Sequence, residues 1–173
     1  MKHKAIVLAV IAATMSAQTA HAATAPEYSV HAQLPRGESM SAIVHVGDRA
    51  RGPLLDVLNA SNAVAQAGAA GKNTAQVALG PEHTCVILSV VTQGNTVTAS
   101  GKANLPPPPP PRQERGPGGA PPPPERGADD APNANVHIVV TLDGRQLRSA
   151  RGNVSPTNGG RGHLEWALER VNH

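Results

Sequence analysis

The chain has almost no aromatic residues: phenylalanine is absent, and Tyr28 and Trp166 are the single tyrosine and tryptophan among 173 residues. Large rings supply much of the buried area in ordinary cores, so a folded domain here has to bury valine, leucine, isoleucine and alanine instead. Proteins that bind single-stranded nucleic acid stack the bases on exposed aromatic side chains. We therefore expect no nucleic acid partner.

Cysteine is equally scarce. Cys85 is the only one, so no disulfide can form within one chain. It opens the apolar run Cys85–Leu88, and a buried cysteine behaves as a small hydrophobic residue. We expect a buried and inert thiol, with an intermolecular disulfide and metal or redox chemistry as the alternatives.

No apolar stretch reaches the roughly 20 residues that a membrane-spanning helix needs. The longest, Ala5–Ala13, lies between a basic start (Lys2 and Lys4) and Ala20-His21-Ala22, which has the A-x-A form of a signal-peptidase site. We expect residues 1–22 to be a secretory signal peptide, with no membrane span after cleavage. The protein is then periplasmic or secreted.

Net charge is small. Loss of Lys2 and Lys4 with the signal peptide lowers the formal charge from +3 to +1, which is no argument for nucleic acid binding. The basic residues that remain as partner-binding candidates are Arg145, Arg148, Arg151 and Arg161. Residues three apart on a regular strand face opposite sides, so these arginines are not expected to form one stripe. They indicate either a solvated hairpin or a contact with an anionic envelope polymer or acidic protein.

Proline is concentrated in one segment: twelve of the seventeen prolines lie between Pro106 and Pro132. Proline blocks adopt the extended polyproline II conformation and cannot join the interior of a sheet. We expect residues 106–135 to be disordered. Because proline-rich segments are ligands for aromatic-lined grooves, this segment is also expected to contact a partner.

On either side of this segment apolar and polar residues alternate, which is the period of a half-buried strand. This alternation predicts strands over residues 28–34, 42–46, 75–79, 97–101 and 136–142. The unbroken apolar run within Thr84–Val91 predicts a central strand covered on both faces. Asp143-Gly144 favours a two-residue hairpin turn, after which residues 145–154 would pair back.

Two helices are expected. Pro53 suits the first position of a helix, and the leucines and valine after it favour a helix over residues 53–70. Asn59–Asn62 is unfavourable for a helix, and a strand followed by a loop is the alternative. At the C-terminus, a short helix is predicted because apolar residues recur at i, i+3, i+4 and i+7. These are Leu164, Ala167, Leu168 and Val171.

These patterns predict a mainly β fold: an antiparallel sheet or small β-sandwich with a short C-terminal helix and one possible internal helix, interrupted by the disordered proline-rich segment. An α+β fold is the alternative. Residues 136–173 are too few to fold alone without a disulfide or a metal. We therefore expect residues 23–105 and 136–173 to form one domain, with residues 106–135 as an excursion from it.

His83 and Cys85 are weak candidates for a metal site. Alternate residues on a strand share a face, so an imidazole and a thiolate could reach one ion. His31, His45 and His137 lie in predicted strands and could complete the ligand set. However, neither Cys-x-x-Cys nor His-x-x-x-His is present, so no metal and no other cofactor is expected.

Catalytic motifs are also missing: the chain has no G-x-S-x-G, no Ser-x-x-Lys and no Gly-x-x-x-x-Gly-Lys. We expect a non-enzymatic exported protein of a bacterial envelope that binds or scaffolds a protein or an anionic envelope polymer. A small periplasmic metal-binding protein using His83 and Cys85 is the first alternative. A secreted enzyme of unrecognised class is the second.

Overall fold

The structure is a computed structural model that describes residues 25–35, 37–48, 52–80, 82–104, 133–157 and 163–172. The predicted signal peptide, nearly all of the proline-rich segment and Arg161 lie outside these residues. The predictions made for them, and the predicted domain bounds, are untested by the fold.

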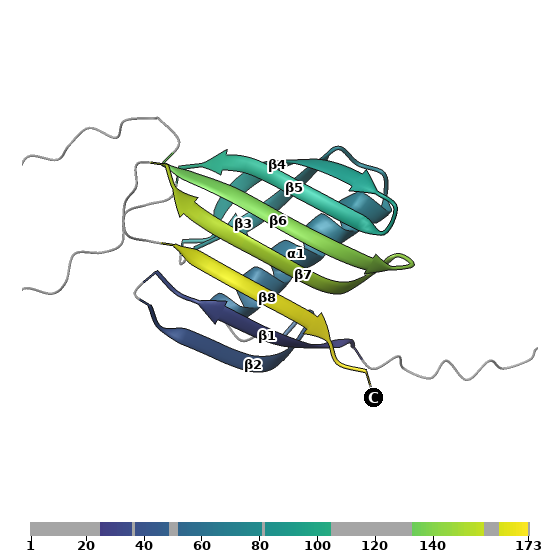
Figure 1. The fold of residues 1–173 in the computed structure, drawn as a ribbon, viewed down its shortest axis with the longest axis horizontal. Helices are drawn as coiled ribbons and strands as arrows, with labels where there is room; N and C mark the ends of the chain where they lie inside the picture. The colour runs from purple at the N-terminus through teal and green to yellow at the C-terminus, as the bar shows by residue number, and fades with distance from the viewer. Residues whose placement is uncertain are drawn as a thin grey trace, which may run out of the picture.

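Within the described residues, eight antiparallel strands form one open sheet in the order β2-β1-β8-β7-β6-β5-β4-β3, shown in Figure 1. In chain order the elements are β1 (Glu27–Gln33), β2 (Ser39–His45), α1 (Pro53–Ala69), β3 (Thr74–Leu79), β4 (Thr84–Gln93), β5 (Thr96–Ala103), β6 (Ala134–Asp143), β7 (Gln146–Pro156) and β8 (Leu164–Arg170). The prediction of a mainly β, antiparallel fold is confirmed. The described residues form one sheet and not a sandwich.

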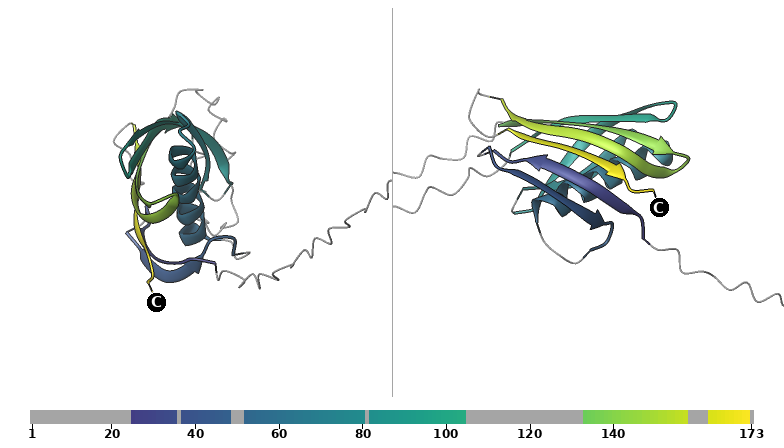
Figure 2. Two further views of the ribbon diagram at one scale, coloured as in Figure 1. Left: turned by 90° about the vertical axis from the view of Figure 1, so that its right-hand side faces the viewer. Right: turned by 60° about the horizontal axis from the view of Figure 1, so that its bottom comes forward.

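The helix α1 connects the two edges of this sheet. It follows β2 at one edge and precedes β3 at the opposite edge, so it crosses one face, and the sheet curves around it (Figure 2). The predicted internal helix is confirmed, with Pro53 in its first turn. Asn59–Asn62 does not interrupt it, because Ala60 and Ser61 are buried in the core.

The core lies between α1 and the sheet face that packs against it, here called the inner face; the opposite side is the outer face. It is aliphatic, as the composition requires, and its fully buried side chains include Leu58 and Val64 of α1 and Val97, Ile138 and Val140 of the sheet. In the described part of the chain, no helix has both the length and the apolar character needed to cross a membrane.

One polar link lies at the centre of the core. The Trp166 Nε1–H donates to Ser61 Oγ at 3.1 Å, and the Ser61 hydroxyl donates to the Val57 carbonyl at 2.7 Å. Gly152 lies opposite Trp166 on β7, where a Cβ would clash with the indole ring. The absence of a side chain at Gly152 therefore makes room for the ring between the sheet and the helix.

The chain on both sides of the proline-rich segment contributes to the same sheet. β6 pairs with β5 from Ala134–Ala103 to Thr141–Thr96, so the strand predicted at residues 136–142 does join the N-terminal strands. The β1–β2 hairpin joins the other end of the meander through β8.

The predicted C-terminal helix is wrong, because residues Leu164–Arg170 form β8. This strand pairs with β1 on one side and β7 on the other. Trp166 and Leu168 are buried while Ala167 between them is exposed, which is strand alternation. Leu164 and Leu168 fit either period, and two neighbouring strands supply backbone hydrogen bonds along both sides of the segment.

The β6–β7 hairpin turns one residue later than predicted. Asp143 pairs with Gln146, so the loop is Gly144-Arg145. Gly144 has φ 62°, the left-handed conformation that a two-residue hairpin loop requires and that glycine adopts without strain.

β4 is covered on one face only, so the prediction of a central strand buried on both faces is wrong. Val86 and Leu88 face α1 and are buried, whereas Cys85 and Ile87 are exposed on the outer face. The predicted buried thiol is also wrong: Cys85 is exposed and accepts a hydrogen bond from Gln76 Nε2 at 2.6 Å. β4 lies next to the edge strand β3, and the single helix of the described residues packs on the inner face.

Candidate functional site: a polar depression on the outer face

A shallow depression of about 400 Å³ crosses four strands on the outer face. It is made of two adjacent rows of cross-strand partners in the order β1-β8-β7-β6. The first row is His31, Ala167, Arg151 and Val139, and the second is Gln33, Glu165, Asn153 and His137. The described structure thus offers a largely polar surface that runs across the strands.

The two histidines lie at opposite ends of the depression. His31 is on β1 and His137 is on β6, three strand spacings apart, which is about 14 Å at roughly 4.8 Å per spacing. Metal–nitrogen bonds are about 2 Å long, so these side chains cannot share one ion. They can instead contact the two ends of an extended ligand.

A β-bulge places two of the predicted arginines on the same face. The β6–β7 register shifts between Thr141 and Leu142, and Leu147 and Ala150 are both buried although they are three residues apart. Arg148 and Arg151 are consequently both exposed. The prediction that residues three apart would alternate faces is wrong for this pair, because a bulge adds one residue to the strand.

The other two arginine candidates are not part of this surface as described. Arg145 lies in the β6–β7 loop at one end of the sheet, and Arg161 is outside the described residues. Arg170, which was not a candidate, binds the same hairpin: it donates to Asp143 Oδ2 at 2.6 Å and to Gln146 Oε1 at 3.0 Å. The Arg170 guanidinium thus links the end of β8 to the β6–β7 hairpin by hydrogen bonds.

Two acidic residues of β8 are exposed on the outer face. Glu165 lies within the depression and its Oε1 is 2.6 Å from His163 Nε2, while Glu169 is exposed nearer the end of the strand. An anionic ligand would therefore be attracted to β7 and β6 and repelled along β8.

One hydroxyl–imidazole pair is present beside the depression. Ser41 Oγ and His31 Nδ1 are 2.6 Å apart, the separation found between a nucleophile and its general base. A catalytic pair also needs a group that orients the base, and among the described residues none is hydrogen-bonded to the second nitrogen of His31. The Ser41–His31 pair alone is therefore not sufficient for a hydrolase mechanism.

The structure does not bring His83 and Cys85 together. His83 is in the turn before β4, with φ 49°, so the rule that alternate strand residues share a face does not apply. Its Nδ1 lies 3.7 Å from Asp56 Oδ1 of α1, on the inner side, whereas Cys85 is on the outer face. Burial raises the pKa of the Asp56 carboxyl above its usual value, and His83 opposes this.

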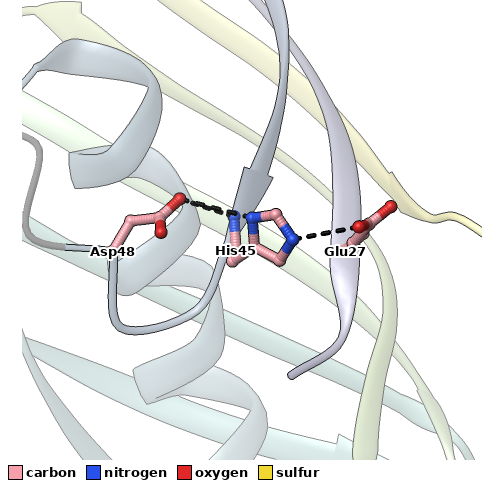
Figure 3. Close-up of polar contacts among 3 residues, drawn as sticks. All are labelled: Glu27, His45 and Asp48. Carbon is pink, nitrogen blue, oxygen red and sulfur yellow. Dashed lines mark hydrogen bonds and ion pairs between the residues drawn. The ribbon is translucent and has the colours of Figure 1, made fainter. Parts of the chain in front are cut away.

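His45 is held by carboxylates at both ring nitrogens (Figure 3). Nε2 is 3.0 Å from Glu27 Oε1, and Nδ1 is 3.5 Å from Asp48 Oδ2. The two carboxylates lie on opposite sides of the ring, so they do not converge on a common ion. Within the described ranges, no group of three or more His, Cys, Asp or Glu residues could hold a metal.

Comparison with protein-family models, curated proteins and solved structures finds no match. Sequence reasoning singled out Arg151, His31 and His137, but not Gln33, Asn153 or Glu165. These residues occupy outward positions in their strands, and that alternation is a usable signal. Their assembly into one surface depends on β8 lying between β1 and β7.

Proposed function

We propose that this is an exported, non-enzymatic binding protein whose outer face binds an anionic partner over β6 and β7. The observation that carries this proposal is the bulge that puts Arg148 and Arg151 on one side of β7, with Arg151 inside the depression. Arginine forms charge-assisted, often bidentate, hydrogen bonds with carboxylate and phosphate groups. His137 at the end of the depression is a further donor to such a ligand.

Two sources of anionic groups fit this surface: an acidic protein and an anionic envelope polymer. Poly-L-glutamate represents the first and polyphosphate the second in a direct binding titration at low and at physiological salt. Exposed charges are screened beyond about 8 Å at physiological ionic strength. We therefore expect weaker binding at higher salt with either probe, and the probe that binds more tightly identifies the source.

The matched variants are Arg151→Gln and Lys102→Gln. Each removes one positive charge from the outer face, but Lys102 is on β5, outside the depression. A charge-assisted hydrogen bond contributes about 1.5–3 kcal/mol, so Arg151→Gln is expected to raise Kd about tenfold or more. Lys102→Gln should change Kd less than about twofold. Equal effects would show that only net charge matters, and no binding of either probe at low salt would refute the proposal.

Export is supported by the predicted signal peptide at residues 1–22. Intact-mass analysis of the mature protein is expected to find a chain that begins at Ala23. A chain in the membrane fraction that still begins at Met1 would contradict this.

The proline-rich segment is proposed as a second contact, with another protein. Ligands of this kind are bound by aromatic-lined grooves, and Tyr28 and Trp166 are at most 3% exposed. The described surface therefore offers no aromatic groove for this chain's own prolines. Deletion of residues 106–132 should leave probe binding by the outer face unchanged while it removes the partner that the segment binds.

A further inference from the structure

The edge strand β2 has backbone hydrogen-bonding groups that no other element of the sheet uses. β2 is the last strand on its side of the sheet, as seen at the lower edge of Figure 1. At its end, the His45 N–H donates to Asp48 Oδ2 at 3.0 Å and the His45 carbonyl accepts from the Asp48 N–H at 3.3 Å. Both backbone groups of His45 are therefore directed away from β1.

In an antiparallel strand, residues two apart direct their backbone groups to the same side. Ser41 and Ile43 must then present their N–H and C=O groups at the open edge, as His45 does. Asp48 occupies the next position along this edge. The part of β2 that can accept another strand is consequently short and is centred on Ala42.

Natural sheets protect their edges with lysine, proline, bulges or inward-pointing charges, because an open edge recruits further strands. From Ser39 to Val44 the sequence is SMSAIV, with none of these residues, and β2 pairs with β1 without a register shift. Two of the large exposed apolar side chains of the described structure also lie here: Met40 is 39% exposed and Ile43 is 55% exposed.

A pocket of about 260 Å³ lies under this edge, between β2 and the start of α1. Its lining includes Met40 and Val44 of β2 and Leu54 and Leu55 of α1. The edge therefore combines open backbone groups with an apolar surface on the inner face that α1 does not cover.

We propose that β2 is a dimerisation edge, which pairs antiparallel with β2 of a second copy of this chain and places Ala42 on the two-fold axis. In this register Ser41 of each copy lies opposite Ile43 of the other, and each of these pairs exchanges two backbone hydrogen bonds. Asp48 ends the ladder at both sides, because His45 would be the next residue to pair. The result is one continuous 16-stranded sheet, with an isologous interface of the kind that closes as a dimer.

The side chains of β2 suit a second copy of β2. On the inner face Met40 lies opposite Val44 of the second copy, above the pocket, and the two small Ala42 side chains meet at the axis. On the outer face the two Ile43 side chains become diagonal neighbours, which are within reach of each other. No charge lies between Ser39 and Val44, so the axis brings no like charges together. This inference does not depend on the proposed function.

The first test compares two exposed isoleucines of the outer face. Ile43→Lys places two lysines at the proposed axis, whereas Ile87→Lys introduces the same charge on β4, where Ile87 is 69% exposed. Light scattering and sedimentation should show a dimer for the parent protein and for Ile87→Lys, and at least a tenfold higher dimer dissociation constant for Ile43→Lys. Circular dichroism should show that both variants fold.

The second test maps the register by cross-linking. Residues directly opposite at a non-hydrogen-bonded position have Cα atoms about 4.5 Å apart, which a disulfide can bridge. In a Cys85→Ser background, Ala42→Cys should therefore form a disulfide-linked dimer under oxidation. Ala78→Cys on the opposite edge strand β3 is the matched control and should not.

Several outcomes would overturn the proposal. These are a parent protein that stays monomeric at every concentration, a dimer that both lysine variants weaken equally, and a cross-link at Ala78→Cys but not at Ala42→Cys. Open-ended oligomers would assign the edge to head-to-tail pairing of β2 with β3 instead.

Discussion

The two edge strands of the sheet differ in how well the helix covers them. On β3, every inner-face residue is buried: Ala75, Val77 and Leu79 are 5%, 3% and 1% exposed. On β2 the inner face is buried only at Val44, while Met40 is 39% exposed. The helix therefore covers the inner face at one edge of the sheet, here called the closed edge, and leaves it partly exposed at the other, the open edge at β2.

The helix α1 is too short to cover the inner face of the sheet at both edges. At about 1.5 Å per residue, the 17 residues of α1 span roughly 25 Å, whereas eight strands about 4.8 Å apart span about 34 Å. A short turn joins α1 to β3, whereas the longer segment 46–52 joins it to β2. The helix therefore lies closer to the β3 edge. We therefore expect residues of β3 to contribute more to stability than those of β2, whose inner face is partly exposed.

The largest expected effect compares truncations at these two edges. Leu79→Ala on β3 should lower the free energy of unfolding by about 2–5 kcal/mol, through lost burial and a residual cavity. Met40→Ala on β2 should cost less than about 1 kcal/mol in dilute protein, since Met40 is partly exposed. Urea unfolding measures both changes in the free energy of unfolding, provided that its dependence on urea concentration has the same slope in all three proteins. Equal losses would show that the two edges are equally packed.

A second prediction concerns the buried hydrogen bond between β8 and α1. Ser61→Ala would remove the acceptor of the Trp166 Nε1–H and leave this buried donor without a partner, at a cost of about 1–3 kcal/mol. Trp166 is the only tryptophan, so its fluorescence reports both unfolding and the local change. Ser89→Ala, at an exposed position of β4, is the control and should have almost no effect. Unchanged Trp166 emission and stability in Ser61→Ala would contradict the link.

A third prediction uses pH to test how β1 is anchored beside the open edge. The Tyr28 hydroxyl donates to the Leu147 carbonyl at 2.8 Å, and burial raises the pKa of Tyr28 above its usual value of 10.0, with Arg170 opposing. The neutral phenol is thus favoured in the folded state. Its contribution is complete below pH 10 and is lost as pH rises further, because the unfolded chain ionises first.

The matched variant for this effect is Tyr28→Phe. It should cost about 0.5–1.5 kcal/mol at neutral pH through the lost hydrogen bond. As pH rises above about 10, the parent protein should lose stability more steeply than Tyr28→Phe. Parallel pH profiles would show that Tyr28 titrates alike in both states.

The smallest effect is expected at Cys85, next to the closed edge. The closed edge is covered on its inner face only, so the thiol on the outer face should react with a labelling reagent in the native protein nearly as fast as in the unfolded protein. Cys85→Ser should change stability by less than about 0.5 kcal/mol, as for other surface substitutions. Labelling that requires denaturant would show that something covers this part of the sheet.

The alternation of apolar residues was enough to locate most strands, and Pro53 with the leucines after it located α1. The predictions for β4 and β8 failed because the local pattern of apolar residues fits more than one structure. Thr84–Val91 is apolar at both parities, so the pattern could not show that Cys85 and Ile87 face solvent. Leu164 and Leu168 fit a helix as well as a strand, and only the pairing with β1 and β7 decides between them.

The candidate site was only partly predictable, because local patterns do not show which strands become neighbours. His31, Arg151 and His137 could be recognised as exposed strand residues. Their grouping requires β8 to lie between β1 and β7, and the shared face of Arg148 and Arg151 requires a bulge, which no local pattern announced.

By itself, the sequence determined the local structure: an aliphatic inner face, one internal helix and hairpins at glycine-containing turns, because these depend on residues close together in the chain. The tertiary structure alone decided the order of the strands, the open edge at β2 and the depression on the outer face. These features depend on contacts such as that between Tyr28 and Leu147, which are 119 residues apart. Such pairing is selected by the burial of the whole sheet against α1 and not by the preferences of any one segment.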